Sequence, residues 1–545
     1  MKSKSSSGFD GVSTQFLKQY CHLLSEPITL IINQSLNTGI FPDKLKIAKV
    51  IPVHKDPLLD RNMLNNYRPI SILPSISKIF ERVAYNQLYS YFSDNNIFYK
   101  SQYGFRKTHS TESAALELVN RIHEYLDKNL TPLAIYMDLS KAFDTINHEI
   151  LLQKLKKYGL SEKTITWFSN YLNSRKQFVS YNNTSSSFSN ISTGVPQGSI
   201  LGPLLFIIYV NDIYSVTNLD LIMYADDTCL LTPIAINHSS TSSKTSIDTA
   251  DTLNQKLNCI YNWLSANKLS LNISKTKCML FHYKQKNIFV NEYPDIKINN
   301  TSLKYEEHYK FLGFFLDNTL SWNYHIHNIA NKISKTNGLL SKLKYFFPCK
   351  ILIMIYNTLI LSRLNYGITL WGFGSCDRIK TIQKKAIRNI NKAPFYSHTK
   401  PLCKTAKLLL FDDIFNLSCL KFFYNYQRNM IPVYFRDIEI IKRYFPKRNN
   451  LRNRIPNQQF PNYITDSVNF RPQYLIPKTK SKSSENRLAF YIPKLLNSGD
   501  IFHCILEKID THSLQGFSHY FKNKIIENYN PNCNIVNCFI CNTNM

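Results

Sequence analysis

The pattern of apolar and polar positions changes several times along the chain from helical spacing to strand-like runs. Residues 75–92 and 111–128 carry apolar side chains at helical spacing, which predicts two amphipathic helices. Short apolar runs at 133–137 and 219–232 predict buried strands, the second folded into a hairpin. From residue 325 to about 430 the pattern is mostly helical. This mixture predicts an α+β protein.

Three segments show where regular structure should stop or continue. Residues 14–38 have helical spacing, and Pro27 predicts a break there because proline lacks the N–H that a helix interior uses. Residues 361–372, LSRLNYGITLWG, predict a single buried helix that contains Trp371. Residues 440–490 are rich in Lys, Arg, Asn and Pro and predict loops.

Two predicted strands end in acidic residues. The run at 133–137 is followed by Asp138, and the hairpin at 219–232 carries Asp226 and Asp227 at its tip. Carboxylates beside buried strands are costly unless a cation or metal compensates them. If the three meet, their hard oxygen ligands suit Mg²⁺ or Mn²⁺. The alternative is that the paired acids simply occupy a turn, where Asp is favoured.

Composition and charge favour a nucleic-acid partner. The chain has 66 Lys and Arg against 37 Asp and Glu, a net charge of +29, and 44% hydrophobic residues exclude general disorder. Residues 331–545 hold 33 basic and 11 acidic residues, whereas residues 1–330 hold 33 and 26. Such a charge indicates a polyanion, and 13% aromatic residues favour nucleic acid over an anionic membrane. The alternative is solubility charge on exposed helices.

The lack of a recognisable targeting signal and the scattered cysteines indicate an intracellular protein. The N-terminus has no apolar signal region, and no apolar run approaches the roughly 20 residues of a membrane helix. We therefore expect the nucleus or cytoplasm and no membrane partner. The tail holds Cys533, Cys538 and Cys541, but a closed zinc site needs four ligands, so we expect free thiols rather than zinc.

Seven motifs, in order along the chain, resemble those of reverse transcriptases from non-LTR (LINE-type, jockey-like) retrotransposons. They are YRPISILPSISKIFERV (67–83), SQYGFRKTHST (101–111), MDLSKAFDTINH (137–148), TGVPQGSILGPLLF (193–206), YADD (224–227), LSLNISKTKCMLF (269–281) and FLGFFLD (311–317). The resemblance covers roughly residues 40–325 well and residues 326–545 more loosely.

The resemblance implies a right-hand polymerase fold of the α+β class: fingers, a palm with a small antiparallel sheet, an α-helical thumb and a basic C-terminal helical extension. The implied domains are an N-terminal helical extension (1–45), fingers (46–130), palm with inserted fingers segments (131–325), helical thumb (326–430) and a partly loop-like basic extension (431–545). Many relatives carry an N-terminal endonuclease domain, and we expect this chain to lack it.

The resemblance also implies a two-metal site for phosphoryl transfer. Asp138 and Asp226 would ligate two Mg²⁺ ions, or Mn²⁺ as the alternative, with Asp227 beside them. The main-chain carbonyl of Leu139 would complete one site. A lysine would donate a proton to the leaving pyrophosphate. Lys275 is the first choice and Lys277 the competing one.

The remaining implied roles concern the nucleotide and the primer. The implied residues are Lys55, Arg68 and Arg106 at the triphosphate, Phe143 under the sugar, Gly194, Gln197 and Gly198 where backbone meets nucleotide and template, and Phe311, Leu312 and Gly313 as the primer grip. Simpler interpretations stay open: Phe143 as core, Arg68 as an ion-pair partner, Lys275 as an exposed lysine, and residues 196–198 as a turn.

Together these features predict an RNA-directed DNA polymerase. It would add dNTPs to the 3′-hydroxyl of a DNA primer on an RNA template, because an aromatic Phe143 would reject a 2′-hydroxyl. Two alternatives remain: a catalytically inactive relic that only binds nucleic acid, and a polymerase that uses ribonucleotides.

Overall fold

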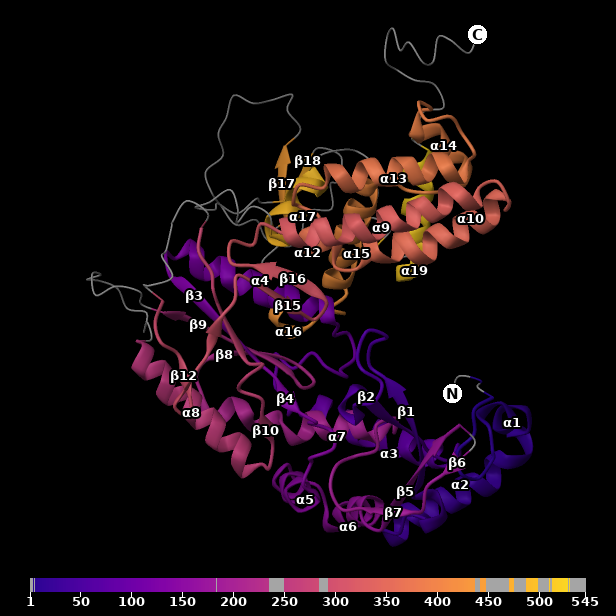
Figure 1. Cartoon of the computed structure of the whole chain (residues 1–545), viewed down its shortest axis with the longest axis vertical. Helices are drawn as coiled ribbons and strands as arrows, with labels where there is room; N and C mark the ends of the chain where they lie inside the picture. The colour runs from indigo at the N-terminus through magenta and orange to yellow at the C-terminus, as the bar shows by residue number, and fades with distance from the viewer. Residues whose placement is uncertain are drawn as a thin grey trace. The chain divides into compact units, whose positions relative to one another are not determined.

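The computed structural model describes most of the chain. The described residues are 3, 5–182, 184–234, 249–283, 293–436, 442–446, 470–474, 487–497, 509, 512–527 and 529. The chain forms two compact units (Figure 1). Unit 1 comprises Met1–Ser110, Leu133–Cys278 and Ile288–Glu306, and unit 2 comprises Thr111–Pro132, Met279–Asn287 and Glu307–Met545. The five domain bounds expected from the sequence stay predictions.

Unit 1 begins with helices around a small sheet. Strand β1 (Ile47–His54) pairs antiparallel with β2 (Tyr67–Ile72) and parallel with β5 (Arg175–Tyr181). Strands β6 (Thr184–Ser185) and β7 (Ser189–Ile191) pair with β5. The helices of this part are α1 (Thr14–Gln19), α2 (Cys21–Thr38), α3 (Ser77–Asp94) and α6 (Glu162–Leu172).

The predicted break at Pro27 is wrong. The chain bends at Tyr20, between α1 and α2, and Pro27 lies inside α2. Ser13 caps α1 by accepting a hydrogen bond from the Phe16 N–H, which fixes where this first short helix begins.

A second sheet in the order β14-β11-β3-β9-β8 carries the acidic motifs. Its strands are β3 (Thr131–Met137), β8 (Asp220–Tyr224), β9 (Asp227–Ile234), β11 (Lys277–Leu280) and β14 (Lys304–Tyr305). Every residue of β3 is buried, as its continuous apolar run predicts. Strands β8 and β9 form the predicted hairpin, with Tyr224 opposite Asp227. Helices α5 (His148–Lys157), α7 (Leu201–Tyr209) and α8 (Ala250–Ala266) belong to the same unit.

Unit 2 is largely helical. Its longest helices are α4 (Thr111–Asp127), α9 (Asn323–Leu343), α13 (Asp377–Ile390), α15 (Phe411–Gln427) and α19 (Leu514–Glu527). Helix α4 belongs here although the sequence placed it in the fingers, and the carboxylate of Glu112 on α4 accepts a hydrogen bond from the Gly367 N–H at 2.9 Å. A two-stranded hairpin, β15 (His308–Phe311) and β16 (Phe314–Asp317), precedes α9.

The helix predicted over 361–372 is interrupted. Helix α11 (Ser362–Asn365) ends before Gly367, whose φ of 58° is left-handed, and α12 (Ile368–Trp371) follows. Trp371 is fully buried, as expected. A Cβ on Gly367 would lie 2.2 Å from a ring carbon of Phe314, so the turn accepts only glycine without rearrangement.

The remaining elements are short. They are η1 (Asp43–Leu45), η2 (Leu64–Asn66), β4 (Leu139–Ser140), η3 (Asn211–Val216), β10 (Ser270–Leu271), β12 (Lys297–Ile298), β13 (Thr301–Ser302), α10 (Cys349–Tyr356), η5 (Asn357–Leu361), α14 (Thr399–Ala406), α16 (Val433–Arg436), β17 (Lys442–Pro446), β18 (Phe470–Tyr474) and α17 (Leu488–Asn497). The antiparallel pair β17 and β18 replaces part of the loop predicted over 440–490. Cys533, Cys538 and Cys541 lie outside the described residues. Among the described helices, none has the length and apolar character that crossing a bilayer requires.

Candidate active site

Three carboxylates meet at one edge of the sheet that contains β3, β8 and β9. Asp138 directly follows β3, and Asp226 and Asp227 lie at the tip of the β8–β9 hairpin beside it. Burial raises the pKa of Asp226, and the negative charge of Asp138 raises it further. Burial, followed by the charges of Asp226 and Asp138, raises the pKa of Asp227 to about 6. The charge of Asp138 therefore acts on both acids of the hairpin tip, which brings the two sequence motifs into one site.

A lysine accompanies this cluster. The Lys275 ammonium nitrogen lies 3.8 Å from a carboxylate oxygen of Asp138. The competing Lys277 instead pairs with Glu306, at 3.3 Å. The placement of the two ammonium groups favours Lys275 over Lys277 for a role at the acids.

The donor set fits a hard divalent cation. Within the described ranges, no three or more His, Cys, Asp or Glu side chains are grouped closely enough to hold a metal ion. Nevertheless, the raised pKa values of Asp226 and Asp227 show that their charged forms lack sufficient compensation. Divalent cations would supply it through the carboxylate oxygens of the two residues and of Asp138.

The hairpin tip is held by a segment whose role the sequence did not reveal. The Tyr103 N–H donates to the Met223 carbonyl at 2.7 Å, which places residues 101–104 beside β8. The side-chain oxygen of Gln102 accepts hydrogen bonds from the N–H groups of Ala225 (3.1 Å) and Gly104 (2.8 Å). Ala225 has a left-handed φ of 58°, so this amide oxygen supports a strained turn next to Asp226.

Gly104 completes this support because it lets two backbones touch. A Cβ on Gly104 would lie 2.3 Å from the Ala225 nitrogen and 2.9 Å from its Cα. Both neighbours are backbone atoms, so a side chain would have to move the hairpin tip. In the sequence, the glycine of the SQYGF motif is the one sign of this close backbone contact. The resemblance assigns a role only to Arg106 in that motif.

Arg106 is engaged within its own loop. Its guanidinium donates hydrogen bonds to the carbonyls of Tyr99 (2.9 Å) and Gln102 (3.3 Å) and lies over the ring of Phe98. Burial lowers its pKa. Through these contacts Arg106 stabilises the segment that supports Ala225. Its contact with a triphosphate stays a prediction.

Lys55 and Arg68 lie on the β1–β2 hairpin. Arg68 is opposite Val53 in this pair, and its side chain is exposed. The Lys55 ammonium donates to the Asn65 carbonyl at 2.6 Å. Both cations stand in unit 1, in which the three acids also lie. Their contact with a triphosphate remains a prediction.

The loop that carries Gly194, Gln197 and Gly198 is fixed by backbone contacts. The Ser71 N–H donates to the Gln197 carbonyl at 2.8 Å, and the Gln197 side chain donates to the Asp144 carboxylate at 2.8 Å. A Cβ on Gly198 would lie 2.3 Å from the Ser71 carbonyl oxygen, and one on Gly194 would lie 2.6 Å from the Asp144 carbonyl oxygen. These glycines permit close approach, and the groups that approach them are protein backbone.

Phe143 is half-buried between two aromatic rings. It stacks on Phe206 of α7, with ring centroids 4.5 Å apart and an angle of 28°, and its edge contacts Phe105 at 6.2 Å. Its carbonyl accepts the Val195 N–H at 3.0 Å. The ring is therefore held rigidly, as either a core residue or a steric gate requires.

The predicted primer grip lies in unit 2. Phe311 is buried, and Leu312 and Gly313 form the β15–β16 turn with φ values of 47° and 89°. The Tyr366 hydroxyl donates to the Leu312 carbonyl at 2.6 Å, and its ring stacks on Phe314 at 4.7 Å. Tyr366 thus supports the turn, a role that sequence reasoning missed.

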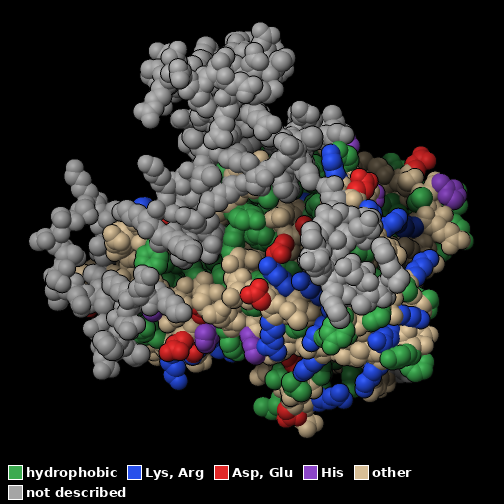
Figure 2. All heavy atoms as spheres, turned by 90° about the horizontal axis from the view of Figure 1, so that it is seen from above, with side chains coloured by type: hydrophobic (Ala, Val, Ile, Leu, Met, Phe, Trp, Pro, Cys, Tyr) green, Lys and Arg blue, Asp and Glu red, His purple; other side chains and the backbone are tan. Residues whose placement is uncertain are grey.

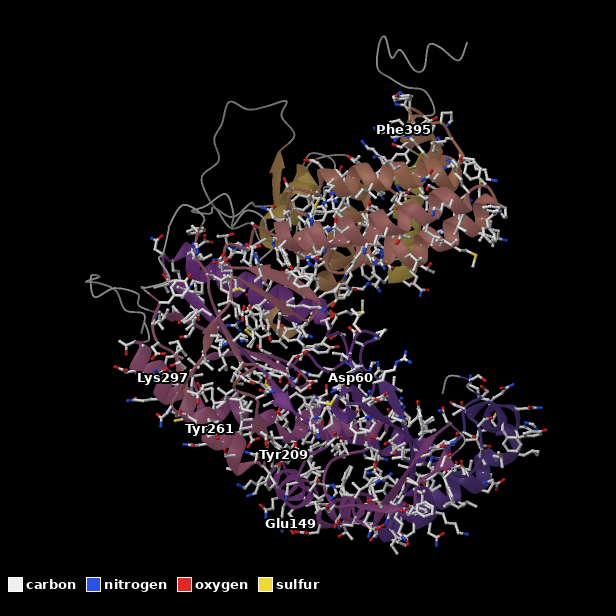
Figure 3. All side chains as sticks on the ribbon, in the orientation of Figure 1. Asp60, Glu149, Tyr209, Tyr261, Lys297 and Phe395 are labelled. Carbon is white, nitrogen blue, oxygen red and sulfur yellow. The ribbon has the colours of Figure 1, made fainter. Side chains whose placement is uncertain are left out.

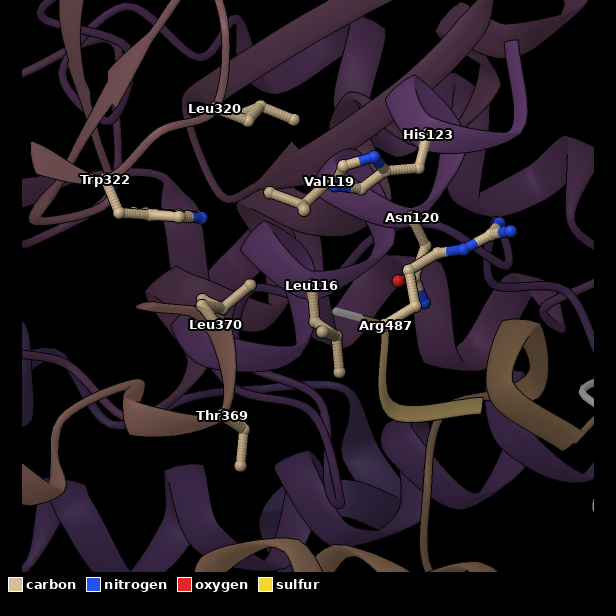
Figure 4. Close-up of a pocket in the computed structure, with 9 residues that line it drawn as sticks. All are labelled: Leu116, Val119, Asn120, His123, Leu320, Trp322, Thr369, Leu370 and Arg487. Carbon is tan, nitrogen blue, oxygen red and sulfur yellow. The ribbon is translucent and has the colours of Figure 1, made fainter. Parts of the chain in front are cut away.

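A cavity elsewhere in unit 2 is too small for a nucleotide. It has a volume of about 20 Å³, room for roughly one water molecule, between α4, α12 and Arg487 (Figure 4). Two buried atoms there, Oδ1 of Asn120 and Nδ1 of His123, have no hydrogen-bond partner among the described residues. One water could satisfy both, so the cavity is part of the helical core and not a substrate site.

A buried strand that ends in an acid, beside a hairpin that presents two more on an α+β scaffold, defines a palm-type polymerase domain. Residues 53–316 match the family model described as reverse transcriptase (RNA-dependent DNA polymerase), so this part of the chain is a domain of that family. The resemblance expected from the seven motifs and the α+β class are thereby confirmed.

The curated relatives come from mobile elements. The chain is 29% identical over 397 residues to the RNA-directed DNA polymerase from mobile element jockey of Drosophila melanogaster, covering 70% of this chain and 41% of that protein. It is 30% identical to the jockey polymerase of Drosophila funebris, covering 69% and 41%. It is 29% identical to the probable RNA-directed DNA polymerase from transposon X-element of Drosophila melanogaster, covering 71% and 42%. The chain thus spans about two fifths of the length of these relatives.

Among solved structures, apo telomerase from Candida tropicalis, truncated from its C-terminal domain, is similar over 51% of this chain and 54% of that chain. The sequence identity is 12% and the TM-score is 0.33.

Proposed function

We propose that this chain is an RNA-directed DNA polymerase that adds dNTPs to the 3′-hydroxyl of a DNA primer on an RNA template. The observation that carries the proposal is the convergence of Asp138 with Asp226 and Asp227 in unit 1, where the charge of the first raises the pKa of the other two. The three acids come from two separate motifs of a reverse transcriptase domain. An acid cluster of this kind can neutralise divalent ions that in turn neutralise a triphosphate.

The reaction divides between the ions and the side chains. Members of this family generally use divalent metal; Mg²⁺, with Mn²⁺ as the alternative, would activate the primer hydroxyl and offset charge on the pyrophosphate. Asp138, Asp226 and Asp227 would hold these ions. The Lys275 ammonium, which lies 3.8 Å from Asp138, would donate a proton to the leaving pyrophosphate. The remaining protein groups position the reactants.

The substrate assignment rests on Phe143. Its ring is held by Phe206 and Phe105, so it can act as a fixed wall against a 2′-hydroxyl. RNA template and DNA primer would be held mainly through their phosphates, because the chain carries a net charge of +29. We place this activity inside the cell, in the nucleus or cytoplasm.

Primer extension with a matched acid variant tests the proposal. Wild-type chain and Asp226→Asn are compared for dNTP incorporation on a primed RNA template with Mg²⁺. Asp226→Asn removes one charge without changing side-chain size, and we expect incorporation to fall at least about a thousandfold because ion neutralisation is lost. Primer–template affinity should change less than about twofold, because the phosphates are bound elsewhere.

Two outcomes would contradict the proposal. If both proteins bind primer–template but neither incorporates nucleotide, the chain is a nucleic-acid-binding relic. If wild type incorporates ribonucleotides as well as deoxynucleotides, the substrate assignment fails while the polymerase chemistry stands.

A further inference from the structure

Helices α9 and α13 of unit 2 lie parallel and end together. Near their beginnings, Arg378 of α13 donates to the side chain of Asn331 on α9 at 2.8 Å. Near their ends, the Lys344 ammonium donates to the side chain of Asn389 at 3.4 Å. The turns that follow the two helices, residues 344–348 and 391–398, are therefore at the same end of unit 2. We name these two turns the aromatic end.

The aromatic end presents five large rings to solvent, of which Phe347, at 40%, is the least exposed. Tyr345 and Phe346 in the first turn are 76% and 80% exposed, and Phe395 and Tyr396 in the second are 61% and 71% exposed. Figure 3 labels Phe395 at this end, beside α14. Rings of this size are normally covered, so a cluster of them on a surface indicates a binding site.

Three cations lie beside these rings. Residues 331–411 contain 15 Lys and Arg and a single acid, Asp377. Lys344 lies 5.2 Å from the Tyr345 ring centre, and Lys385 and Arg388 lie 5.9 and 5.8 Å from that of Phe395. Figure 2 shows basic side chains interspersed with hydrophobic ones on the described part of the face that it draws. An occupant of the aromatic end must therefore be both anionic and able to cover flat rings.

The turns are ordered by the same cations. The Arg388 guanidinium donates to the Ser397 carbonyl at 2.7 Å, which ties the second turn back to α13. Lys344 joins the first turn to α13 through Asn389. The rings of Phe395 and Tyr396 contact edge to face, with centres 5.2 Å apart. Because both turns are already tied to α13, binding of a flat ligand would cost the protein little backbone conformational entropy.

We propose that the aromatic end binds single-stranded nucleic acid, with unpaired bases stacked on the rings and phosphates facing the lysines and arginines. A duplex hides the faces of its bases inside the stack, so it could use the charges but not the rings. A protein partner would need an acidic surface to face Lys344, Lys385 and Arg388. The inference rests on the proposed function, since it assigns a place for an unpaired strand of template or primer.

The test uses the full chain and two matched pairs of substitutions. Phe395→Ser with Tyr396→Ser removes two rings of the aromatic end. Phe16→Ser with Tyr20→Ser is the control. Phe16 lies on α1 of unit 1 and Tyr20 directly after it; both are also exposed, at 49% and 38%, and their rings are 4.8 Å apart. Fluorescence anisotropy measures binding of a labelled oligothymidylate of about 20 nucleotides and of a duplex of equal length.

We expect the Phe395/Tyr396 variant to bind the single strand at least about tenfold more weakly, as the loss of one or two stacked bases predicts. Its affinity for the duplex and the affinities of the control variant should stay within about twofold of wild type. Phe395→Trp with Tyr396→Trp should restore the single-strand affinity. Circular dichroism melting confirms that each variant is folded.

Other outcomes overturn the inference. Equal losses for single strand and duplex would show that only charge matters at this end. Unchanged affinity with lost self-association, measured by light scattering, would make the aromatic end an interface between copies of the chain. The measurement is repeated in the Asp226→Asn background, where incorporation plays no part. Failure of the polymerase proposal would therefore leave the binding result interpretable.

Discussion

The two units use charge in opposite ways. Unit 1 gathers three carboxylates at Asp138, Asp226 and Asp227, and burial and mutual repulsion raise the pKa of the last two. Unit 2 contains residues 331–411, where 15 basic residues accompany one acid. An acid cluster concentrates cations for phosphoryl transfer, whereas a basic surface concentrates a polyanion. The proposed chemistry and the proposed capture of nucleic acid therefore belong to different units and can be disturbed separately.

Glycines in two turns of unit 1 and a glycine on helix α9 of unit 2 differ in how closely other atoms approach them. In unit 1, Gly104 touches Ala225 and Gly198 touches Ser71, so a Cβ on either glycine would lie 2.3 Å from a backbone atom. In unit 2, a Cβ on Gly338 of α9 would meet no described atom within 4 Å apart from the nearby backbone of its own helix. A site that fixes reacting groups needs such close backbone contacts, whereas a helical scaffold tolerates open positions.

The largest expected effect comes from Gly104→Ala. The new methyl group would push on the backbone of Ala225 and displace the adjacent Asp226. We expect incorporation to fall at least about a hundredfold, because a shift of an ångström at reacting groups has effects of that size. Single-turnover primer extension measures the rate.

Gly338→Ala in unit 2 is the matched control for this substitution. It should leave the rate unchanged and stabilise the protein by about 0.5–1 kcal/mol, because alanine is the better residue inside an exposed helix. If Gly104→Ala incorporates nucleotide at the wild-type rate, the close contact with Ala225 does not position the acids.

A smaller effect concerns how the stability of unit 2 depends on pH. His325 of unit 2 is buried, and this burial lowers its pKa to about 4. Between pH 6.5 and 4 the unfolded chain binds a proton at this residue that the folded chain does not, so stability falls as the pH falls. From pH 7 to pH 5 the loss should be about 2 kcal/mol for this residue.

Comparison with the variant His325→Asn measures how much of the stability lost between pH 7 and pH 5 comes from His325. The Nδ1 atom of His325 accepts the Phe315 N–H at 3.2 Å, and an asparagine oxygen can take its place without titrating. Urea unfolding followed by tryptophan fluorescence is suitable, since the rings of Trp322 and Trp371 lie 5.9 and 5.8 Å from His325. Equal losses for wild type and variant between pH 7 and pH 5 would contradict the assignment.

The smallest expected effect concerns sugar selection in unit 1. Phe143→Val should lower the preference for dNTPs over rNTPs by about tenfold, because a smaller side chain leaves room for a 2′-hydroxyl. The ratio of kcat/KM for the two nucleotides measures it. Phe188→Val, at an exposed aromatic residue of the same unit, should leave the ratio unchanged.

A different result at Phe143 would change the interpretation of its contacts. If Phe143→Val lowers the melting temperature but keeps the nucleotide ratio, the stacking on Phe206 is core packing only. Oligothymidylate affinity should stay at the wild-type value in either case, because the aromatic end lies in unit 2.

Sequence reasoning located the acids and most of the elements that carry them. The continuous apolar run before Asp138 became the fully buried β3, and the apolar–acidic–apolar pattern around Asp226 became the β8–β9 hairpin. It failed at two helices. Pro27 lies inside α2, and the helix expected over 361–372 is broken at Gly367, where the Phe314 ring leaves no room for a side chain.

The supporting residues could not be found in this way because their contacts join distant parts of the chain. Gln102 acts on Ala225, 123 residues away, and Tyr366 acts on Leu312, 54 residues away. Hydrophobic periodicity reports which face of an element is buried, but not which turn a side-chain amide or hydroxyl will reach.

By itself, the sequence determined the family, the α+β class, the acids at strand ends and the unequal distribution of charge, since each depends on residue type and local order. Only the tertiary structure decided that Lys275 rather than Lys277 stands beside Asp138, that Arg106 is engaged in its own loop, and that two distant turns form one aromatic end. The physical reason is that such relations depend on distances between segments, which the packing of helices and strands fixes and local sequence does not encode.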